Sequence, residues 1–496
     1  MLKKLVLKAG VNRENTRYTN ENGWYESDKV RFRQGTPEKI GGWVRISANT
    51  FLGICRSLWN WVTLGGLNLL GVGTNLKFYI ENGGAYYDIT PTKPVVTLVN
   101  PFTTDTATNS GGYTTVTVTD AGGGYLDKDF VTFTGGTAVG GVTVSGEYQI
   151  TKTSTTTYTI SVSGTASSST TGGGTVYAVY QINTGPELVV PATGWGAGYW
   201  GSGYWGIGGT SAESIRIWSQ TNFGSDLLYA PRGGAIYYWN SALGITASTI
   251  TTTIASPCVV TGTISLPDNT AIVLQTTGAL PTGLLVGTTY YVKSSLGTTY
   301  NLSATPGGAA INTSGTQSGI HSISPRGIAL SSLSGASNVP VIQDLIFVSD
   351  TSRFVFAFGC NDYGTTVQSK MLIRWSDQES LTDWTPAATN QAGSILLSHG
   401  SQIVTCVQTR QEIVVFTDSS LYSLQFVGPP AIWQSQLLGD NISIAGPNAA
   451  TLGSGVIYWM GVDKFYKYDG RVSTLRCDLR QFIYGDINLA QADQFF

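Results

Sequence analysis

The acidic residues of this sequence are the first side chains to consider as a source of chemistry. Asp377, Glu379 and Asp383 lie close together, and hydrolysis of a glycosidic bond uses two carboxylates about 5–10 Å apart. The chain has 30 acidic residues, so neighbouring carboxylates also arise by chance. No acid or base partner accompanies this cluster, which flanks a turn before Trp384. We therefore expect these carboxylates to be structural.

Motifs for metal binding, triad catalysis and nucleotide binding are present only in fragments. The two histidines, His321 and His399, lie in different segments, and Asp127 and Asp129 lack the glycine and glutamate of a calcium loop. The pattern GxGxxG occurs twice within residues 196–206, but glycines and aromatics continue on both sides and no helix follows. The sequence thus predicts no catalytic residue, no cofactor and no metal.

The cysteines and the start of the chain indicate where the protein is made. Five cysteines are scattered and never form a CxxC pair, which argues for reduced thiols and synthesis in a cytoplasm. The basic start has too short an apolar run for a signal peptide. No stretch reaches the ~18 apolar residues that span a bilayer, so we expect no membrane insertion.

The composition indicates a β-protein whose surface meets other chains. Hydrophobic residues make up 41% of the 496 residues, whereas charged residues make up only 12%, against a usual share of roughly 25%. So few charges leave little solubilising surface, which favours permanent contacts with other chains. The 62 glycines and the abundant Thr and Ser indicate strands and turns. We predict an all-β fold class in about two to four folded units.

One hairpin pattern recurs five times. An apolar run, a short turn and an aromatic-rich return strand follow one another at residues 69–79, 226–239, 345–358, 413–424 and 456–470. Radially repeated antiparallel sheets of this kind predict a β-propeller. The alternative is a set of unrelated hairpins in sandwiches, because hairpin patterns alone are weak indicators.

Two stretches rich in Thr and Gly interrupt the hairpin pattern. Residues 95–185 and 251–325 alternate Thr or Ser with apolar residues, as half-buried strands do. We expect each to form a small β-sandwich domain of the Ig-like kind, inserted into a propeller loop where insertions cost little. The predicted division is an N-terminal arm with the first propeller strands at 1–94, inserted β-domains at 95–185 and 251–325, a propeller continuation at 186–250, and propeller blades at 326–496.

Two segments combine features of protein-binding surfaces. Residues 1–60 hold eleven Lys or Arg against five acids, interleaved with aromatics, and residues 194–206 alternate Gly with Trp and Tyr. Aromatic groups surrounded by charge are typical of interface centres and rims. For the basic residues the alternative is a solvated strand face, where ion pairs contribute little. The interface candidates are Trp24, Tyr25, Arg31, Phe32, Arg33, Lys39, Trp43, Arg45, Trp195, Trp200 and Trp205.

Several motifs, in their order along the chain, resemble a known family. They lie at residues 22–43, 217–239, 374–377, 443–447 and 459–470. In these stretches the chain resembles the tail nozzle proteins, also called tail hub or DNA-stabilisation proteins, of short-tailed bacteriophages (podoviruses). Similar proteins continue well past residue 496, so we expect either a different closure of the propeller or a missing segment.

The resemblance implies a structural virion protein with no catalysis and no cofactor. It implies a homo-oligomeric, sixfold ring that is assembled in the host cytoplasm and lies below the portal and the tail adaptor ring. Such a ring extends the DNA channel, retains packaged DNA, lets it pass at ejection, and holds a tail fibre or needle protein at its tip. In the basic arm, residues 1–60, we expect Arg31, Arg33, Lys39 and Arg45 to contact protein, either the adaptor or a neighbouring subunit. A strongly basic channel would bind phosphates and slow the DNA.

The aromatic residues are also compatible with a function of another class, carbohydrate binding. Exposed Trp and Tyr stack on sugars as readily as they pack on protein, so a carbohydrate-binding or depolymerising propeller used in host adsorption is the alternative. A periplasmic propeller is a third possibility, which the lack of a signal peptide disfavours.

Overall fold

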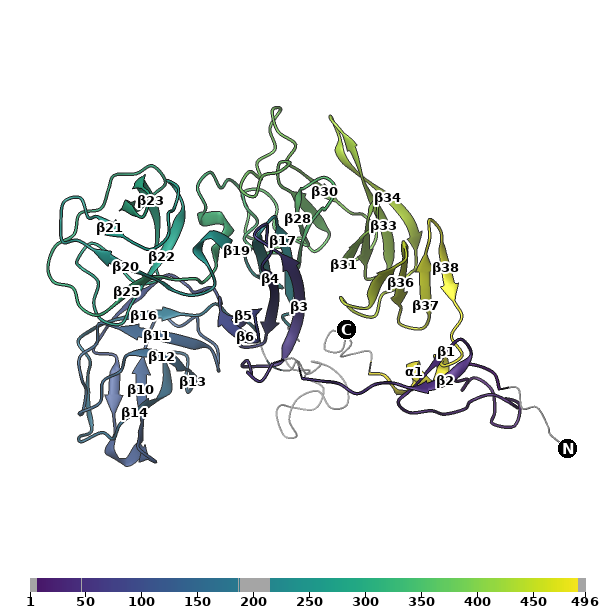
Figure 1. Ribbon diagram of the computed structural model, residues 1–496, viewed down its shortest axis with the longest axis horizontal. Coiled ribbons are helices and arrows are strands. Elements are labelled where there is room, and N and C mark those ends of the chain that lie inside the picture. The colour runs from purple at the N-terminus through teal and green to yellow at the C-terminus, as the bar shows by residue number, and fades with distance from the viewer. Residues whose placement is uncertain (1–6, 46, 186, 188–214, 489–496) are drawn as a thin grey trace.

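The computed structural model describes residues 7–45, 47–185, 187 and 215–488, and within them the chain is built almost entirely of β-sheet (Figure 1). The exceptions are one short helix, α1 (Arg480–Asp486), and three 3-10 turns, η1 (Thr106–Thr108), η2 (Ser241–Leu243) and η3 (Leu330–Ser332). The all-β fold class is therefore confirmed. No helix in the described ranges has the length and apolar character needed to cross a bilayer.

Five four-stranded antiparallel sheets, named sheets 1 to 5, form the body of the protein (Figure 1). Sheet 1 contains β3 (Cys55–Val62), β4 (Asn68–Thr74), β5 (Phe78–Asn82) and β6 (Ala85–Asp88), and sheet 2 contains β17 (Trp218–Phe223), β18 (Asp226–Pro231), β19 (Tyr237–Trp239) and β26 (Ile328–Ala329). Sheet 3 contains β27 (Leu345–Val348), β28 (Val355–Phe358), β29 (Leu372–Trp375) and β30 (Gly393–Leu396).

The two remaining sheets follow directly along the chain. Sheet 4 contains β31 (Ile403–Gln408), β32 (Ile413–Thr417), β33 (Ser420–Gly428) and β34 (Ile432–Asp440), and sheet 5 contains β35 (Ala450–Gly453), β36 (Val456–Met460), β37 (Phe465–Tyr468) and β38 (Val472–Leu475). Each predicted hairpin lies in a different one of the five sheets. Central strands such as β28 and β32 are buried throughout, because neighbouring sheets cover both of their faces, and all their residues except Thr417 are apolar.

Consecutive sheets pack face to face, as the blades of a propeller do. Separate hydrophobic clusters join sheets 1 and 2, 2 and 3, 3 and 4, and 4 and 5. Aromatic rings cross three of these boundaries, with centroid separations of 4.9 Å for Phe78–Trp218, 5.0 Å for Phe356–Trp433 and 5.3 Å for Phe416–Trp459. No cluster of the described residues joins sheet 5 to sheet 1, so the five sheets form an open row.

A sandwich module lies between sheet 1 and sheet 2 in the sequence. One of its sheets has the order β12-β11-β16-β7 and the other β13-β14-β10-β8-β15, with β9 beside β10, and a single hydrophobic core lies between them. The alternation predicted for residues 114–119 is seen in β10, whose side chains are buried and exposed in turn. Its strands are β7 (Val96–Val99), β8 (Phe102–Thr104), β9 (Asn109–Ser110), β10 (Tyr113–Thr119), β11 (Phe130–Thr134), β12 (Gly146–Gln149), β13 (Thr151–Lys152), β14 (Thr157–Ser163), β15 (Thr170–Gly172) and β16 (Thr175–Tyr180).

A barrel module lies between β19 and β26 of sheet 2. It is a closed six-stranded barrel of order β20-β21-β24-β23-β22-β25, where we expected a second sandwich. The sheet closes because β25 pairs with both β20 and β22, which leaves no free edge. Its strands are β20 (Ser248–Thr252), β21 (Val260–Thr261), β22 (Ala271–Thr276), β23 (Thr289–Leu296), β24 (Thr299–Ser303) and β25 (His321–Ile323).

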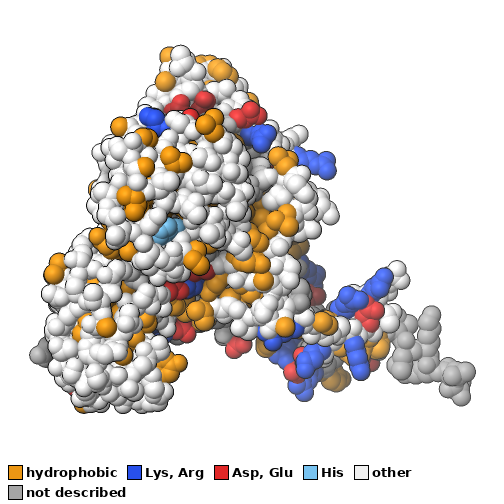
Figure 2. Space-filling model, turned by 60° about the vertical axis from the view of Figure 1, so that its left-hand side comes forward, with side chains coloured by type: hydrophobic (Ala, Val, Ile, Leu, Met, Phe, Trp, Pro, Cys, Tyr) orange, Lys and Arg blue, Asp and Glu red, His pale blue; other side chains and the backbone are white. Residues whose placement is uncertain are grey.

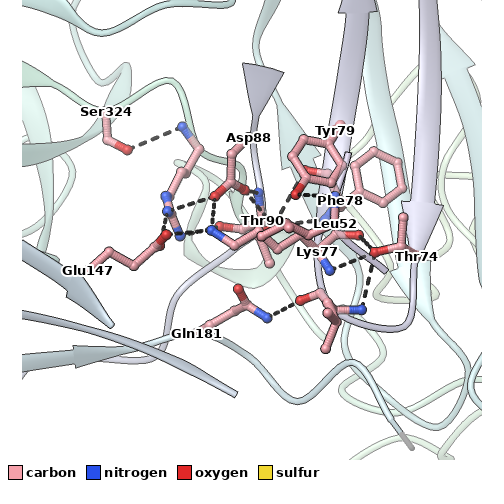
Figure 3. A network of polar contacts seen from close by, with 12 residues as sticks. Leu52, Thr74, Lys77, Phe78, Tyr79, Asp88, Thr90, Glu147, Gln181 and Ser324 are labelled. Atoms are coloured by element: carbon pink, nitrogen blue, oxygen red, sulfur yellow. Dashed lines mark hydrogen bonds and ion pairs between the residues drawn. The ribbon is translucent and has the colours of Figure 1, made fainter. Parts of the chain in front are cut away.

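Four charged side chains form a junction where the two modules meet sheet 1 (Figure 3). Lys77 is buried, Arg326 and Asp88 are partly buried, and the side chain of Glu147 is 32% exposed. Lys77, just before β5, places its Nζ 2.7 Å from Asp88 Oδ2 and 2.5 Å from Glu147 Oε2. Arg326, which follows the barrel, places its Nη2 2.9 Å from Asp88 Oδ2 and 2.8 Å from Glu147 Oε1. Burial would raise the pKa of Asp88, but the charges of Arg326 and Lys77 hold it below its ordinary value. We call these four residues the junction.

Candidate interface: the basic arm

Of the predicted basic arm, residues 7–45 precede the part that packs on sheet 1, and this segment is called the arm from here on. It contains a small hairpin of β1 (Val30–Arg33) and β2 (Thr36–Lys39). Gln34 and Gly35 both have positive φ, as the two-residue turns that fit the twist of a hairpin require. Strand alternation places Val30 and Phe32 on the half-buried side and the two arginines of β1 on the exposed side. The exposed face of the hairpin therefore carries Arg33 and the ion pair of Arg31 with Glu38, which lies opposite Arg31 in the register.

The arm has no hydrophobic core of its own. Among its residues only Asn20 is buried, and its side chain donates hydrogen bonds to the carbonyls of Asn12 and Trp24. Apolar side chains are instead left in solvent: Trp43 is fully exposed and Val44 is 87% exposed. Large exposed apolar groups next to one another are typical of surfaces that another molecule covers.

Some basic side chains of the arm form ion pairs or hydrogen bonds within the chain, and others form none with the described residues. Arg31 Nε lies 2.6 Å from Glu38 Oε1, and Arg45 donates to the carbonyls of two nearby residues. Arg33 and Lys39 make no hydrogen bond or ion pair with the described part of the chain. Figure 2 shows how Lys and Arg side chains gather along this extension, while they are sparse on the rest of that face.

One end of the arm is tied to the C-terminal helix α1 (Figure 1). The guanidinium of Arg13 lies 4.1 Å from the ring centre of Phe482, and the backbone N–H of Gln481 donates to Glu14 Oε1 at 2.6 Å. Tyr484 of the same helix packs its ring 5.5 Å from Phe465 of sheet 5. This anchor was not predicted, because nothing local in the sequence links residues so far apart.

The predicted aromatic candidates do not form one cluster. Trp24 and Phe32 pack together with ring centres 6.0 Å apart, and Tyr25 lies under two arginines of the arm. Trp43 has no aromatic ring neighbour among the described residues and is fully exposed. The other three candidates, Trp195, Trp200 and Trp205, lie outside the described residues.

The first two carboxylates of the acidic cluster have ordinary structural surroundings. Asp377 Oδ1 accepts a hydrogen bond from the backbone N–H of Gln391 at 2.8 Å. Glu379 lies 3.9 Å from Arg353 at the surface, where both side chains are more than half exposed. Neither arrangement places a second carboxylate opposite the first, as the paired acids of a glycosidase would require.

Asp383 is likewise held as a hydrogen-bond acceptor. It accepts from the side chain of Asn390 at 2.9 Å, from the backbone of Thr385 at 3.1 Å and from the hydroxyl of Ser337 at 3.1 Å. Burial would raise the pKa of Asp383, but these hydrogen bonds hold it below its ordinary value. Asp383 therefore favours its charged form, and its hydrogen bonds stabilise the turn around Trp384.

The two histidines also have local partners. His321 lies in the barrel, where Thr276 Oγ1 is 2.8 Å from its Nδ1 and burial lowers its pKa. His399 lies beside Ser398 and Tyr422, far along the chain from the barrel. The described ranges contain no group of three His, Cys, Asp or Glu side chains that could hold a metal ion. All five cysteines are free thiols.

Comparisons with known proteins do not identify a family for this chain. No family model and no curated protein matches the sequence. Among solved structures, the chain is similar to one described as Phage phi92 endosialidase, over 82% of this chain and 51% of that chain, with 12% identity and a TM-score of 0.18. A likeness of this size carries no argument about fold or activity.

Proposed function

We propose that the chain is a structural, non-enzymatic subunit of the tail nozzle of a short-tailed bacteriophage, where several copies form a ring around the path of the DNA. The observation that carries this proposal is the arm. It holds eight basic side chains and exposed aromatic rings but no buried apolar side chain. An isolated two-stranded hairpin is marginally stable in water, so the arm gains order when another chain covers it.

Sheet 1 offers a second surface suited to assembly. Its side away from sheet 2 exposes Leu58 by 62% and Val62 by 58%, and Leu64 in the following turn is 95% exposed. Phe51 covers part of this side of sheet 1 by packing on Tyr79 and Tyr86. The part formed by Leu58, Val62 and Leu64 stays exposed and is available to a neighbouring chain. Flat apolar faces of this kind are buried repeatedly when identical subunits close a ring.

The arm suits a contact with protein better than a contact with DNA. A channel lined with free arginines would neutralise phosphates and hold the DNA with a salt-sensitive affinity. Charges around an aromatic centre instead give a protein interface its register and its choice of partner. We propose the tail adaptor ring and the neighbouring subunit as the partners of the arm.

Electron microscopy of purified virions and analytical ultracentrifugation of the isolated chain test this function together. We expect a ring of defined size in solution and density for it between the adaptor and the tip of the tail. A chain that is absent from virions and stays monomeric at all concentrations, alone and beside its adaptor, would overturn the proposal.

The carbohydrate-binding or depolymerising alternative has less support among the described residues. A cavity of about 430 Å³ between the two modules is lined by Thr, Ser, aliphatic side chains, Gln275 and Arg326, with no aromatic ring on which a sugar could stack. Asp377 and Asp383 are committed to local hydrogen bonds. Glycan arrays and polysaccharide-cleavage assays decide: sugar binding that is lost in Asp377→Asn or Asp383→Asn would favour this alternative.

A further inference from the structure

The last strand of each sheet in the row is an edge strand, and one of the five is unlike the others. β6, β30 and β38 have four residues each and β26 has two, whereas β34 has nine. Short edge strands present few unpaired N–H and C=O groups and so resist pairing with other chains. β34 presents a long, free edge.

This edge also lacks the usual chemical protection. No charged residue occurs between positions 421 and 439, so both strands of the β33–β34 hairpin are neutral until Asp440. The exposed side chains of Gln434 and Gln436 make no hydrogen bond with the described part of the chain. Natural edge strands are commonly blocked by lysines, prolines or bulges that turn the edge away. β34 contains no lysine or proline. Its pairing with β33 shifts register at Leu437–Gly439 and beside Ile432, and the residues between these two shifts, 433–437, pair regularly.

The β33–β34 hairpin extends beyond the rest of sheet 4. β32 pairs with β33 only as far as Leu424, whereas β34 follows β33 to Gly428. Figure 1 shows this end of β34 rising above its neighbours. Phe426 and Val427 near the tip are 44% and 49% exposed, so the projecting end is apolar as well as uncharged.

We propose that the free edge of β34 pairs with the β1–β2 hairpin of a second copy of this chain, so that an intermolecular sheet joins neighbouring subunits. The inference rests on the proposed ring and names the contact that builds it. A two-stranded hairpin needs at least a third strand for stability, and β34 supplies one through backbone hydrogen bonds.

The charges of the two elements are complementary. Arg33 and Lys39 are without an acidic partner among the described residues. At the base of β34, Asp418 and Asp440 form no ion pair in the described ranges. Each accepts hydrogen bonds from a serine hydroxyl and a backbone N–H, which fix the carboxylate in place without neutralising its charge. Opposite charges on the two elements would fix the register of the pairing and suppress wrong partners.

The contact joins two different surfaces, the edge of β34 on one copy and the β1–β2 hairpin on the next. Each copy can therefore bind two neighbours, one through each surface. Within one copy the arm lies by α1 and sheet 5, while the projecting end of β34 points to the opposite side of the molecule (Figure 1). A head-to-tail contact between unlike surfaces generates a ring when its rotation closes.

The first test places lysines on the exposed edge. In the full chain, Gln434→Lys with Gln436→Lys should raise the concentration at which rings form at least tenfold, without lowering the melting temperature. Thr451→Lys with Thr474→Lys is the matched control, because it adds the same charge at exposed positions of edge strands β35 and β38 in sheet 5. If the β34 variant assembles like the control while deletion of residues 1–45 abolishes assembly, the arm docks elsewhere and the inference fails, although the ring proposal stands.

The second test maps the contact directly. Isotope-labelled and unlabelled copies are mixed, and a carbodiimide then links Lys amines to neighbouring carboxylates. We expect a peptide pair joining Lys39 of one copy to Asp440 or Asp418 of the other, with both isotope compositions. Links from Lys39 only to carboxylates of the same copy, or only to an adaptor protein, would overturn the inference. A chain that forms no ring in any preparation would instead count against the proposed function.

Discussion

The arm and the junction both concentrate charge, but they bury it to different degrees. At the junction the side chains of Lys77 and Arg326 are 5% and 16% exposed, whereas Arg31 in the arm is 60% exposed. Where water is largely excluded, a charge is stabilised mainly by its ion-pair partners, and removing one partner leaves the other charge uncompensated, which destabilises the fold. In water an ion pair contributes little, and its members are free to meet another chain. Burial therefore decides whether a basic side chain holds the fold together or is left for a partner.

The largest effect on the free energy of unfolding is expected when Arg326, one of the two cations of the junction, is removed. Arg326→Ala leaves Asp88 and Glu147 with Lys77 alone, and we expect a loss of about 3–5 kcal/mol in the free energy of unfolding. Denaturant unfolding measures this, with Arg31→Ala in the arm as the matched control, expected within about 0.5 kcal/mol of the parent. A loss at Arg326 no greater than that of the control would mean that the junction is as solvent-screened as the arm.

Deletion of the sandwich module should have an intermediate effect. Replacing residues 95–180 with a short glycine linker removes Glu147, partly uncovers Lys77 and keeps Ile182, which belongs to the core between sheets 1 and 2. We expect sheets 1 to 5 to fold with a loss of about 1–3 kcal/mol. Adding Lys77→Met to the deletion should recover part of that loss, because Asp88 then balances Arg326 alone in place of two cations. Calorimetry of both variants measures the difference. If the deleted chain no longer unfolds cooperatively, the module belongs to the core of the body and is not an insert.

What the sequence could predict follows from the range of the interactions involved. The five hairpins and the alternation of β10 are local patterns, and both appear where predicted. The closed barrel depends on β25 pairing with β20 and β22, strands that lie far before it in the chain. The junction joins Glu147 to Arg326, and the arm is anchored to α1 across almost the whole sequence. Pairings between residues so far apart leave no periodic pattern in the sequence. The sequence also does not indicate which of its arginines has a partly buried side chain.

A smaller, pH-dependent effect is expected from a buried carboxyl in the sandwich module. Asp129 is buried, and burial raises its pKa to about 6 despite a hydrogen bond from the backbone of Leu126. Between its unfolded pKa of about 4 and pH 6 the folded state binds the extra proton, so this group's contribution to stability falls as pH rises through that window. Asp129→Asn should therefore stabilise the protein by about 1–3 kcal/mol at pH 7 and by little at pH 4.

Thermal unfolding at the two pH values checks this prediction. Asp127→Asn, two residues earlier and exposed, is the matched control and should show no such pH dependence. Equal stabilisation by Asp129→Asn at pH 4 and pH 7 would show that the carboxyl is ionised in the folded state across the whole range.

The smallest effect on folding, and the sharpest contrast with the junction, is expected in the arm. Arg31→Glu with Arg33→Glu reverses two charges on an exposed strand face, so the free energy of unfolding should change by less than about 0.5 kcal/mol. Assembly should nevertheless weaken, because the reversed charges now meet like charges on the adaptor or on the neighbouring subunit, and such juxtaposition is strongly unfavourable. Sedimentation of the ring and its co-assembly with the adaptor measure this. Normal assembly combined with an altered rate of DNA ejection would place these side chains in the channel, and the arm would then belong with the DNA path and not with the contacts between subunits.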